Sequence, residues 1–290
     1  MTKRNPEYDF KWCPGCGDFG VVRAVELTLA DRAQRLGEPV EKTAIVAGIG
    51  CSGNLVHLQE GPQPFGIHGI HGRTLPIAWG LKASRPDMNV LVVAGDGDFL
   101  SIGAEHIGPQ AKRNLDITAV IMDNGIYGLT KGQASPTTAL SVVTSTTPYG
   151  KLDDALNPLE VYLGLGVSYV VSAVSTRPKE LAEQIGRAME YPGFAIVHVQ
   201  SPCTTYNDTY EALKGNEKKG IEAAAYQLPE DHDPTDLGAA MAHARSGRIP
   251  LGVLYARPNS VPMHERLEQA KASHNATTRT VEQMLAGFAI

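Results

Sequence analysis

Two short segments of this chain place oxygen ligands directly after apolar runs. Asp96 lies in Gly95-Asp96-Gly97-Asp98, and a second apolar run, Ile117 to Met122, ends at Asp123 and Asn124. Glycines let a backbone approach a phosphate closely. Carboxylate, carboxamide and carbonyl oxygens are the ligands of a magnesium ion that bridges a diphosphate. Gly-Asp-Gly alone is more often an ordinary turn, but the second segment at this distance favours a metal–diphosphate site.

The chain has four cysteines, and two of them are close in sequence. Cys13 and Cys16 form a Cys-x-x-Cys motif, whereas Cys51 and Cys203 each follow an apolar run. Four thiolates close a tetrahedral zinc site or ligate a cubane iron–sulfur cluster. A redox disulfide of the Cys-x-x-Cys pair would leave the other two cysteines without a role. A buried free cysteine is also a common core residue, so zinc, a cluster and a structural role all stay open here.

The elements that must position these residues alternate along the chain, as expected for an α/β fold with a doubly wound, mostly parallel sheet. Near-continuous apolar strands between helices indicate a sheet covered on both faces. Ligands of such sheets bind at the carboxyl ends of the strands, where the loops described above lie. The expected strands end at Ile49, Asp96, Asp123, Ser172 and Gln200, and the expected helices cover residues 19–35, 75–83, 103–113 and 179–191.

Beyond residue 207 this alternation fades. We expect residues 1–207 to form the domain that binds the cofactor and the metal cluster. Residues 208–290 are expected to form an irregular and helical extension, with helices near 236–245 and 260–285, that packs on this domain or on another subunit. The Ser-, Thr- and Pro-rich segment 135–150 is expected to be a structured loop or lid.

Composition excludes several classes of function. The formal net charge of the 290 residues is -5, which gives no basic surface for nucleic acid. No apolar run approaches the roughly 20 residues that cross a bilayer, and the polar start has no signal-peptide core. The sequence therefore predicts a cytoplasmic protein that binds neither nucleic acid nor membrane.

Taken together, the motifs resemble the beta subunits of the 2-oxoacid:ferredoxin oxidoreductases, which use thiamine diphosphate. The resemblance covers roughly residues 12–207. It rests on six segments: Trp12-Cys13-Pro14-Gly15-Cys16-Gly17, Gly48-Ile49-Gly50-Cys51-Ser52-Gly53, His71-Gly72-Arg73, Gly95-Asp96-Gly97-Asp98, Asn124 to Gln133 and Ser201-Pro202-Cys203.

The resemblance implies a role for each matching residue. Cys13, Cys16, Cys51 and Cys203 would hold a 4Fe-4S cluster, and Asp96, the Asn124 side chain and the Ile126 carbonyl would hold Mg²⁺. His71 and Lys131 are the catalytic candidates, Lys131 as a contact for the substrate carboxylate; a structural histidine and a surface lysine are the alternatives. The residues expected around thiamine diphosphate are Gly50, Cys51, Ser52, His71, Gly95, Gly97, Asp98, Asn124, Tyr127, Gly128, Leu129 and Thr130.

The reaction that the resemblance implies is the coenzyme A-dependent oxidative decarboxylation of a 2-oxoacid, or its reversal, with electrons passed to ferredoxin. We expect an alpha subunit to supply the pyrimidine-side domain, in an (alpha-beta)2 assembly, because this chain has room for only one nucleotide-type domain. 2-Oxoglutarate is favoured over pyruvate, and Asn54 is expected to line the pocket. The alternatives are a non-oxidative thiamine diphosphate-dependent decarboxylase subunit and a zinc-stabilised nucleotide-binding module.

Overall fold

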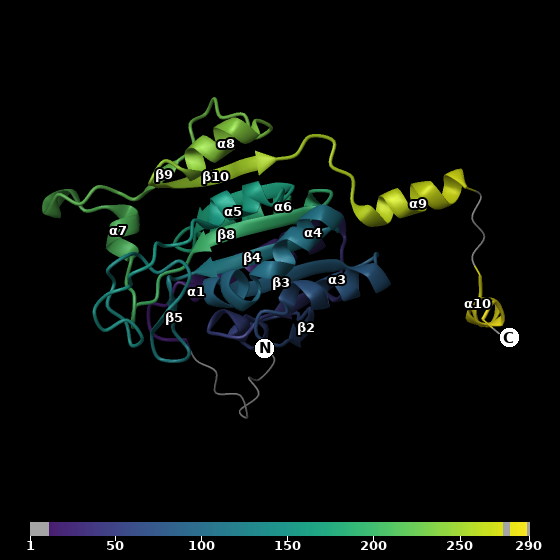
Figure 1. Ribbon diagram of the computed structural model, residues 1–290, viewed down its shortest axis with the longest axis horizontal. Coiled ribbons are helices and arrows are strands. Elements are labelled where there is room, and N and C mark those ends of the chain that lie inside the picture. Colours follow the sequence, from purple (N-terminus) through teal and green to yellow (C-terminus); the bar gives the residue numbers. More distant parts are fainter. Residues whose placement is uncertain (1–11, 275–278, 289–290) are drawn as a thin grey trace.

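The computed structural model describes residues 12–274 and 279–288, which form a mostly parallel sheet between two layers of helices (Figure 1). Its eight strands follow the order β2-β1-β3-β4-β8-β7-β10-β9, and β5 and β6 form a separate hairpin. The strands are β1 Thr43–Ala47, β2 Phe65–His68, β3 Asn89–Gly95, β4 Ile117–Asp123, β5 Ile126–Tyr127, β6 Gln133–Ala134, β7 Tyr169–Val174, β8 Phe194–Gln200, β9 Ala225–Gln227 and β10 Ile249–Ala256.

The middle strands are parallel because both of their faces are buried under helices. Every residue of β4 is buried, and valine and isoleucine side chains are frequent in β3 and β4. The pairs β1–β3, β3–β4 and β4–β8 are all parallel, so their carboxyl ends lie along one edge. The predicted α/β class with a mostly parallel sheet is thereby confirmed.

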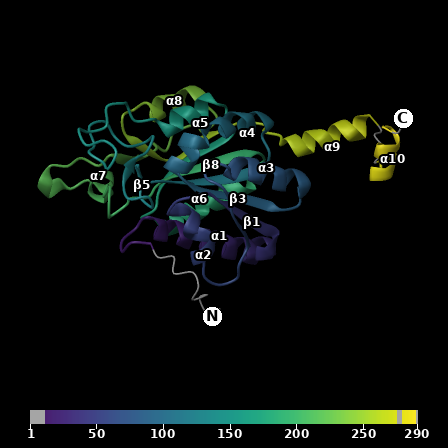
Figure 2. The same cartoon turned by 60° about the horizontal axis from the view of Figure 1, so that its bottom comes forward.

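Helices cover both faces of this sheet. One apolar layer contains α3, α4, α5 and α8, and the other contains α1 and α6 (Figure 2). The helices are α1 Asp18–Leu36, α2 Leu55–Leu58, α3 Thr74–Ser84, α4 Ile107–Arg113, α5 Pro158–Gly164, α6 Pro178–Glu190, α7 Tyr210–Lys214, α8 Leu237–Ala244, α9 Met263–Ser273 and α10 Val281–Ala286. Within the described ranges, none of these helices has the length and hydrophobicity to cross a membrane.

The helix expected over residues 103–113 is wrong in its first half. A π-helical turn, Asp98–Ile102, is followed by a 3-10 turn, Ala104–His106, and only then by α4. A π turn widens the helix locally and is frequent beside functional sites. Here it follows directly after Asp96 and Gly97.

The segment after residue 207 contains more regular structure than the sequence suggested. Strand β10 pairs antiparallel with β7, and β9 pairs parallel with β10, so this segment extends the main sheet. The single helix expected over 260–285 is wrong, although its residues 275–278 lie outside the described ranges: α9 ends at Ser273, and the separate helix α10 begins at a capping box on Thr280. These two helices form an arm that projects from the body (Figures 1 and 2). The division at residue 207 stays a prediction.

Candidate active site

A cavity of about 160 Å³ lies at the carboxyl ends of β1, β3 and β4. All twelve residues that the sequence placed around a diphosphate cofactor line it, as do the proposed magnesium ligands Asp96 and Ile126. The lining residues are Ile49, Gly50, Cys51, Ser52, His71, Gly95, Asp96, Gly97, Asp98, Asn124, Ile126, Tyr127, Gly128, Leu129 and Thr130. The structure therefore brings the predicted residues together, while their individual roles stay predictions.

The cavity depends on close backbone packing at Gly97. A Cβ atom at this position would lie 2.3 Å from the Tyr127 ring, which is too close for any side chain. The Tyr127 hydroxyl donates a 3.0 Å hydrogen bond to the Gly97 carbonyl. The glycine thus lets the hairpin strand β5 close over the end of β3, so that both strand ends face one space.

Asp96 is an acid that the fold buries almost completely. Asp96 is 1% exposed, and its side chain accepts hydrogen bonds from the Asn124 backbone N–H at 3.4 Å and from the Thr137 hydroxyl at 2.8 Å. Burial and the nearby Asp123 carboxylate raise the pKa of Asp96 to about 7. A buried, polarised carboxylate beside a side-chain amide and a turn carbonyl is a donor set that suits Mg²⁺.

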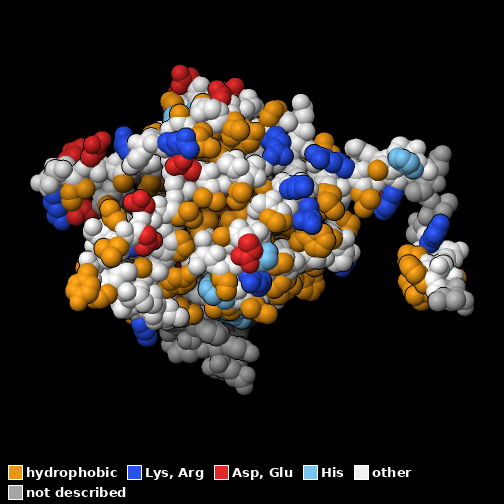
Figure 3. Space-filling view, viewed as in Figure 1, with side chains coloured by type: hydrophobic (Ala, Val, Ile, Leu, Met, Phe, Trp, Pro, Cys, Tyr) orange, Lys and Arg blue, Asp and Glu red, His pale blue; other side chains and the backbone are white. Residues whose placement is uncertain are grey.

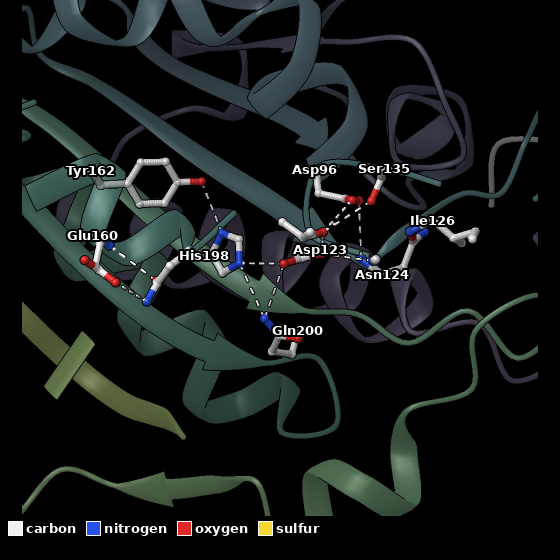
Figure 4. Close-up of polar contacts among 12 residues, drawn as sticks. Asp96, Asp123, Asn124, Ile126, Ser135, Glu160, Tyr162, His198 and Gln200 are labelled. Atoms are coloured by element: carbon white, nitrogen blue, oxygen red, sulfur yellow. Dashed lines mark hydrogen bonds and ion pairs between the residues drawn. The ribbon is translucent and has the colours of Figure 1, made fainter. Parts of the chain in front are cut away.

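A buried series of hydrogen-bonded polar groups extends from Asp96 into the protein interior (Figure 4). Thr137 also contacts Asp123 at 2.7 Å, Asp123 contacts His198 Nε2 at 3.0 Å, and the Tyr162 hydroxyl lies 3.2 Å from His198 Nδ1. Burial opposes the ionisation of Asp123, but its hydrogen bond and ion pair with His198 lower its pKa overall. Asp123 is therefore the charged member of the carboxylate pair.

The Thr137 hydroxyl lies between the carboxyl groups of Asp96 and Asp123 and bears on which of the two is protonated. Its one proton can be donated to only one of the two acids, Asp96 and Asp123, although it lies within hydrogen-bond distance of both. The contact with Asp96 is satisfied when that carboxyl itself carries a proton, which agrees with its raised pKa. A cation bound to Asp96 would replace this proton.

Sequence reasoning missed Thr137, His198 and Tyr162. Thr137 lies in the loop expected over residues 135–150, which the structure ties to the site through the Thr138 hydroxyl and the Gly125 carbonyl, 2.6 Å apart. His198 lies on β8 opposite Ile121 of β4, and its side chain contacts Asp123, two residues further along β4. A lone histidine within an apolar strand was the one available signal.

Asp98 orients His71 and holds two loops together. Its Oδ1 accepts hydrogen bonds from the amides of Ile49 at 3.0 Å and Gly72 at 2.8 Å, and lies 2.5 Å from His71 Nδ1. Asp98 Oδ2 is buried and has no hydrogen-bond partner in the described part of the chain. Because Nδ1 is engaged, the free Nε2 edge of His71 is left for the cavity.

The cavity is not lined by three nearby polar residues, Arg73, His68 and Asn54. Arg73 donates to the Ile102 carbonyl at 2.8 Å and pairs with Glu105, so it ties the backbone at the sheet edge. His68 contacts His57 at 2.8 Å. Asn54 is buried and does not line the cavity, so the expectation that it does is wrong.

Lys131 is exposed and stands next to the cavity wall rather than in it. Its backbone has φ 84°, a left-handed conformation that costs a non-glycine residue about 1–3 kcal/mol. Such strain persists where the surrounding structure fixes it, often at functional sites. Its predicted contact with a substrate carboxylate stays a prediction.

Three loops bring the four cysteines together beside the same cavity. The Cys13–Cys16 loop is held by hydrogen bonds from the Trp12 indole to the Cys51 carbonyl, 2.7 Å, and from the Gly17 amide to the Pro202 carbonyl, 3.0 Å. A Cβ atom on Gly128, in the cavity wall, would lie 3.5 Å from Cys51 Sγ and 3.7 Å from Cys203 Sγ. The thiols and the cavity thus share a wall.

The surroundings of Cys16 and Cys51 disfavour a negatively charged thiolate. Burial, Asp18 and the neighbouring thiols raise the pKa of Cys51 to about 12, and burial and the same kinds of neighbour also raise the pKa of Cys16. Thiolates at these positions require a compensating positive centre. In the described ranges no three His, Cys, Asp or Glu side chains are placed to share a single metal ion.

Two protein-family profiles together match most of the chain. The profile described as thiamine pyrophosphate enzyme, C-terminal TPP binding domain, matches residues 48–199. The profile for the C-terminal part of the pyruvate ferredoxin oxidoreductase beta subunit matches residues 203–272.

Curated relatives and a solved structure are similar over most of the chain. A 2-oxoacid:ferredoxin oxidoreductase subunit beta of Saccharolobus solfataricus is 34% identical, covering 91% of this chain and 87% of the relative. A 2-oxoglutarate synthase subunit KorB of Archaeoglobus fulgidus is 34% identical, covering 78% of this chain and 82% of the relative. A structure of 2-oxoglutarate:ferredoxin oxidoreductase from Magnetococcus marinus, with 2-oxoglutarate, coenzyme A and succinyl-CoA bound, is 37% identical, with a TM-score of 0.85, over 98% of this chain and 94% of that one.

Proposed function

This chain belongs to the family of 2-oxoacid:ferredoxin oxidoreductase beta subunits, and on that premise we propose that it catalyses the coenzyme A-dependent oxidative decarboxylation of 2-oxoglutarate, or the reverse reaction. The resemblance read from the sequence is confirmed at the level of the family. The chain is an oxidoreductase subunit with a thiamine pyrophosphate-binding domain. The observation that carries the proposal is the shared wall between the cavity and the cysteine thiols at Gly128.

The residues of the cavity fit a magnesium diphosphate. Asp96, the Asn124 side chain and the Ile126 carbonyl would hold Mg²⁺, and the fit rests on the buried Asp96 carboxyl with its raised pKa. Bound thiamine diphosphate supplies an electron sink for decarboxylation. This chain's own contribution is to exclude water, to fix the diphosphate at the strand ends, and to aim the Nε2 edge of His71 at the cavity through Asp98.

The four cysteines would hold a 4Fe-4S cluster. The fit rests on the three loops that bring the cysteines together and on the Cys51 and Cys203 thiols behind Gly128, and four thiolates are the usual ligands of such a cluster. Such a centre beside the cofactor wall would accept electrons and pass them to ferredoxin. Cys13 is the exposed member of the set and marks the side that faces an electron acceptor.

A beta subunit works with an alpha subunit and a ferredoxin. The surface around the cavity has the exposed apolar side chains expected of a contact with the alpha subunit. Ile49 and Leu129, which line the cavity, are 40% and 51% exposed, and Ile70, next to the lining residue His71 in the chain, is 71% exposed. Exposed apolar side chains gathered at one site mark an interaction surface. We infer that the pyrimidine-side domain of the alpha subunit packs over these side chains and completes the coenzyme A site, in an (alpha-beta)2 assembly.

2-Oxoglutarate is the favoured substrate because of the relatives named above. Its second carboxylate needs a cationic contact, and Lys131, held in a strained conformation at the cavity edge, is the candidate from this chain. Assay of the complete enzyme with 2-oxoglutarate and pyruvate tests this choice. A higher kcat/KM for pyruvate would overturn it.

The first test of the proposal is the cofactor content of the anaerobically purified protein, co-expressed with its alpha subunit. Four iron, four sulfide and one thiamine diphosphate per beta chain are expected. Thiamine diphosphate with zinc in place of iron would indicate the non-oxidative decarboxylase subunit, and zinc without thiamine diphosphate would indicate the nucleotide-binding module. Either result would overturn the proposed electron transfer.

A further inference from the structure

The arm formed by α9 and α10 ends in an apolar stripe. Val281, Met284, Leu285 and Phe288 follow the spacing i, i+3, i+4, i+7 and are 61%, 48%, 64% and 84% exposed. α10 starts at its own capping box on Thr280 and buries none of its residues. A helix this short is not stable in water without packing, so the stripe needs a surface that covers it.

A matching apolar groove lies on the body. Leu75, Pro76, Trp79 and Pro109 line a cavity of about 180 Å³ between α3 and α4. The adjoining hollow is lined by Met263 and Arg266 of α9, and it shares Pro109 and Arg113 with the groove. The buried indole N–H of Trp79 has no hydrogen-bond acceptor within the described residues. The groove therefore starts at the base of the arm, and the described residues of this chain do not fill it.

The charged residues at the groove and on α10 are opposite in sign, in addition to the apolar residues that both surfaces carry. Lys112, Arg113 and Arg266 line the hollow at the base of the arm, and the Arg113 guanidinium lies 5.4 Å from the centre of the Trp79 ring. Glu282 is the one charged residue within α10. Figure 3 shows the basic side chains next to apolar ones near the base of the arm, and the apolar group of α10 at its far end. The one acidic side chain of α10 could thus pair with a basic side chain at the groove while the apolar stripe covers its apolar lining.

We propose that the arms of two copies of this chain cross, so that α10 of each copy lies in the α3–α4 groove of the other. Every copy carries both the stripe and the groove, and a two-fold exchange covers both at once. Packing of the arm on a different subunit would cover the stripe and leave the groove open. This inference is independent of the proposed chemistry, because neither surface touches the cavity.

The test is the mass of the complete enzyme in solution, measured by light scattering during gel filtration. Particles with two copies of this chain are expected. The variant Met284→Asp/Leu285→Asp should weaken their association at least tenfold and yield particles with one copy. The matched control Leu152→Asp changes an 87% exposed leucine in a loop away from the arm and should keep the mass. An unchanged mass for the stripe variant would overturn the proposal.

A charge exchange tests the specific contact. Arg113→Glu and Glu282→Arg should each weaken association, and the variant that carries both changes should recover it, because the pair then meets with reversed charges. Misfolding of either single variant would not produce such a recovery. Additive weakening in the combined variant would exclude this pairing.

Photo-cross-linking identifies the occupant of the groove. Two differently tagged copies are co-expressed with the partner subunit, one of them with benzoylphenylalanine at position 285. A cross-link to residues 75–113 of the other tagged copy is expected. A cross-link to the same copy, to the partner subunit or to another surface would refute the exchange.

Discussion

At the scale of single residues, Asp96 and Asp123 form a buried pair of carboxyl groups whose pKa values are shifted in opposite directions. His198 keeps Asp123 charged, whereas burial and the Asp123 charge favour a proton on Asp96. A metal ion that binds at Asp96 must displace this proton. The affinity of the site for Mg²⁺ is therefore coupled to pH through Asp96. The sequence identified Asp96 as a ligand but did not identify His198 as a neighbour of the pair.

Substituting Asp96→Asn should remove the anionic ligand and keep the shape of the side chain. We expect magnesium-dependent binding of thiamine diphosphate to weaken roughly 100-fold, the equivalent of a lost hydrogen bond to a charged group. Calorimetric titration measures it. The iron content should match that of the unmodified protein, since the cysteines lie in other loops. Unweakened cofactor binding would show that Asp96 is not a ligand.

The raised pKa of Asp96 also predicts how Mg²⁺ stabilises the protein at different pH values. The folded-state pKa of about 7 exceeds the ordinary value of 3.8. The stability that its protonation provides is therefore complete below about pH 4 and is lost as the pH rises through 7. Mg²⁺ replaces the proton, so its effect on the melting temperature should be larger at pH 8 than at pH 6. An Asp96→Asn control should lose this difference.

Asp98 is expected to position His71 rather than to bind the diphosphate. Asp98→Asn keeps the size but changes the hydrogen bond to His71 Nδ1, so kcat should fall roughly 10- to 100-fold, as for other residues that orient a functional histidine. Cofactor affinity should change little. The double variant Asp98→Asn/His71→Ala should be no slower than His71→Ala alone, because the two residues act as a unit. Additive losses would contradict this role.

Residue types in the sequence identified the candidate ligands of this site but not the residues that hydrogen-bond to them. Asp96, Asn124 and the cysteines stand out because their chemistry and spacing are unusual. Thr137 and His198 do not, because a threonine in a polar loop and a histidine in an apolar strand have many ordinary uses. Only the pairing of β4 with β8, in which Gln200 lies opposite Asp123 and His198 two residues before Gln200, brings the His198 side chain to Asp123.

At the scale of elements, the cysteine site depends on three separate loops, which precede α1 and follow β1 and β8. Cys203→Ala should remove one ligand and lower the iron and sulfide content by at least half, with loss of electron transfer to ferredoxin. Bound thiamine diphosphate should remain, because Cys203 does not line the cavity. Full iron content in this variant would exclude the four-cysteine set.

Periodicity predicted the central strands well because buried parallel strands are almost continuously apolar. It failed for β2 and β9, which are four and three residues long, and for β10, in which a proline and a glycine interrupt the apolar run. It also joined α9 and α10, since the capping box at Thr280 lies within a polar stretch that otherwise permits helix. Short or irregular elements depend on their neighbours more than on their own pattern.

At the scale of the whole molecule, the exposed rim of the cavity predicts that this chain is inactive alone. The purified chain, loaded with thiamine diphosphate and Mg²⁺, should not reduce a viologen dye with 2-oxoglutarate and coenzyme A. Addition of the alpha subunit should restore the reaction. The control Tyr149→Ala changes a 95% exposed residue and should not alter this restoration. Turnover by the isolated chain would contradict the need for a partner.

Strand β10 also has a consequence for synthesis of the protein. It covers the edge of β7, yet it is translated about 75 residues later than that strand. Until it emerges from the ribosome, the nascent sheet has an uncovered parallel edge, which is a template for pairing with other chains. A chain released early, before residue 249, would keep that edge. The last part of the sequence thus protects the first part from aggregation before any cofactor is bound.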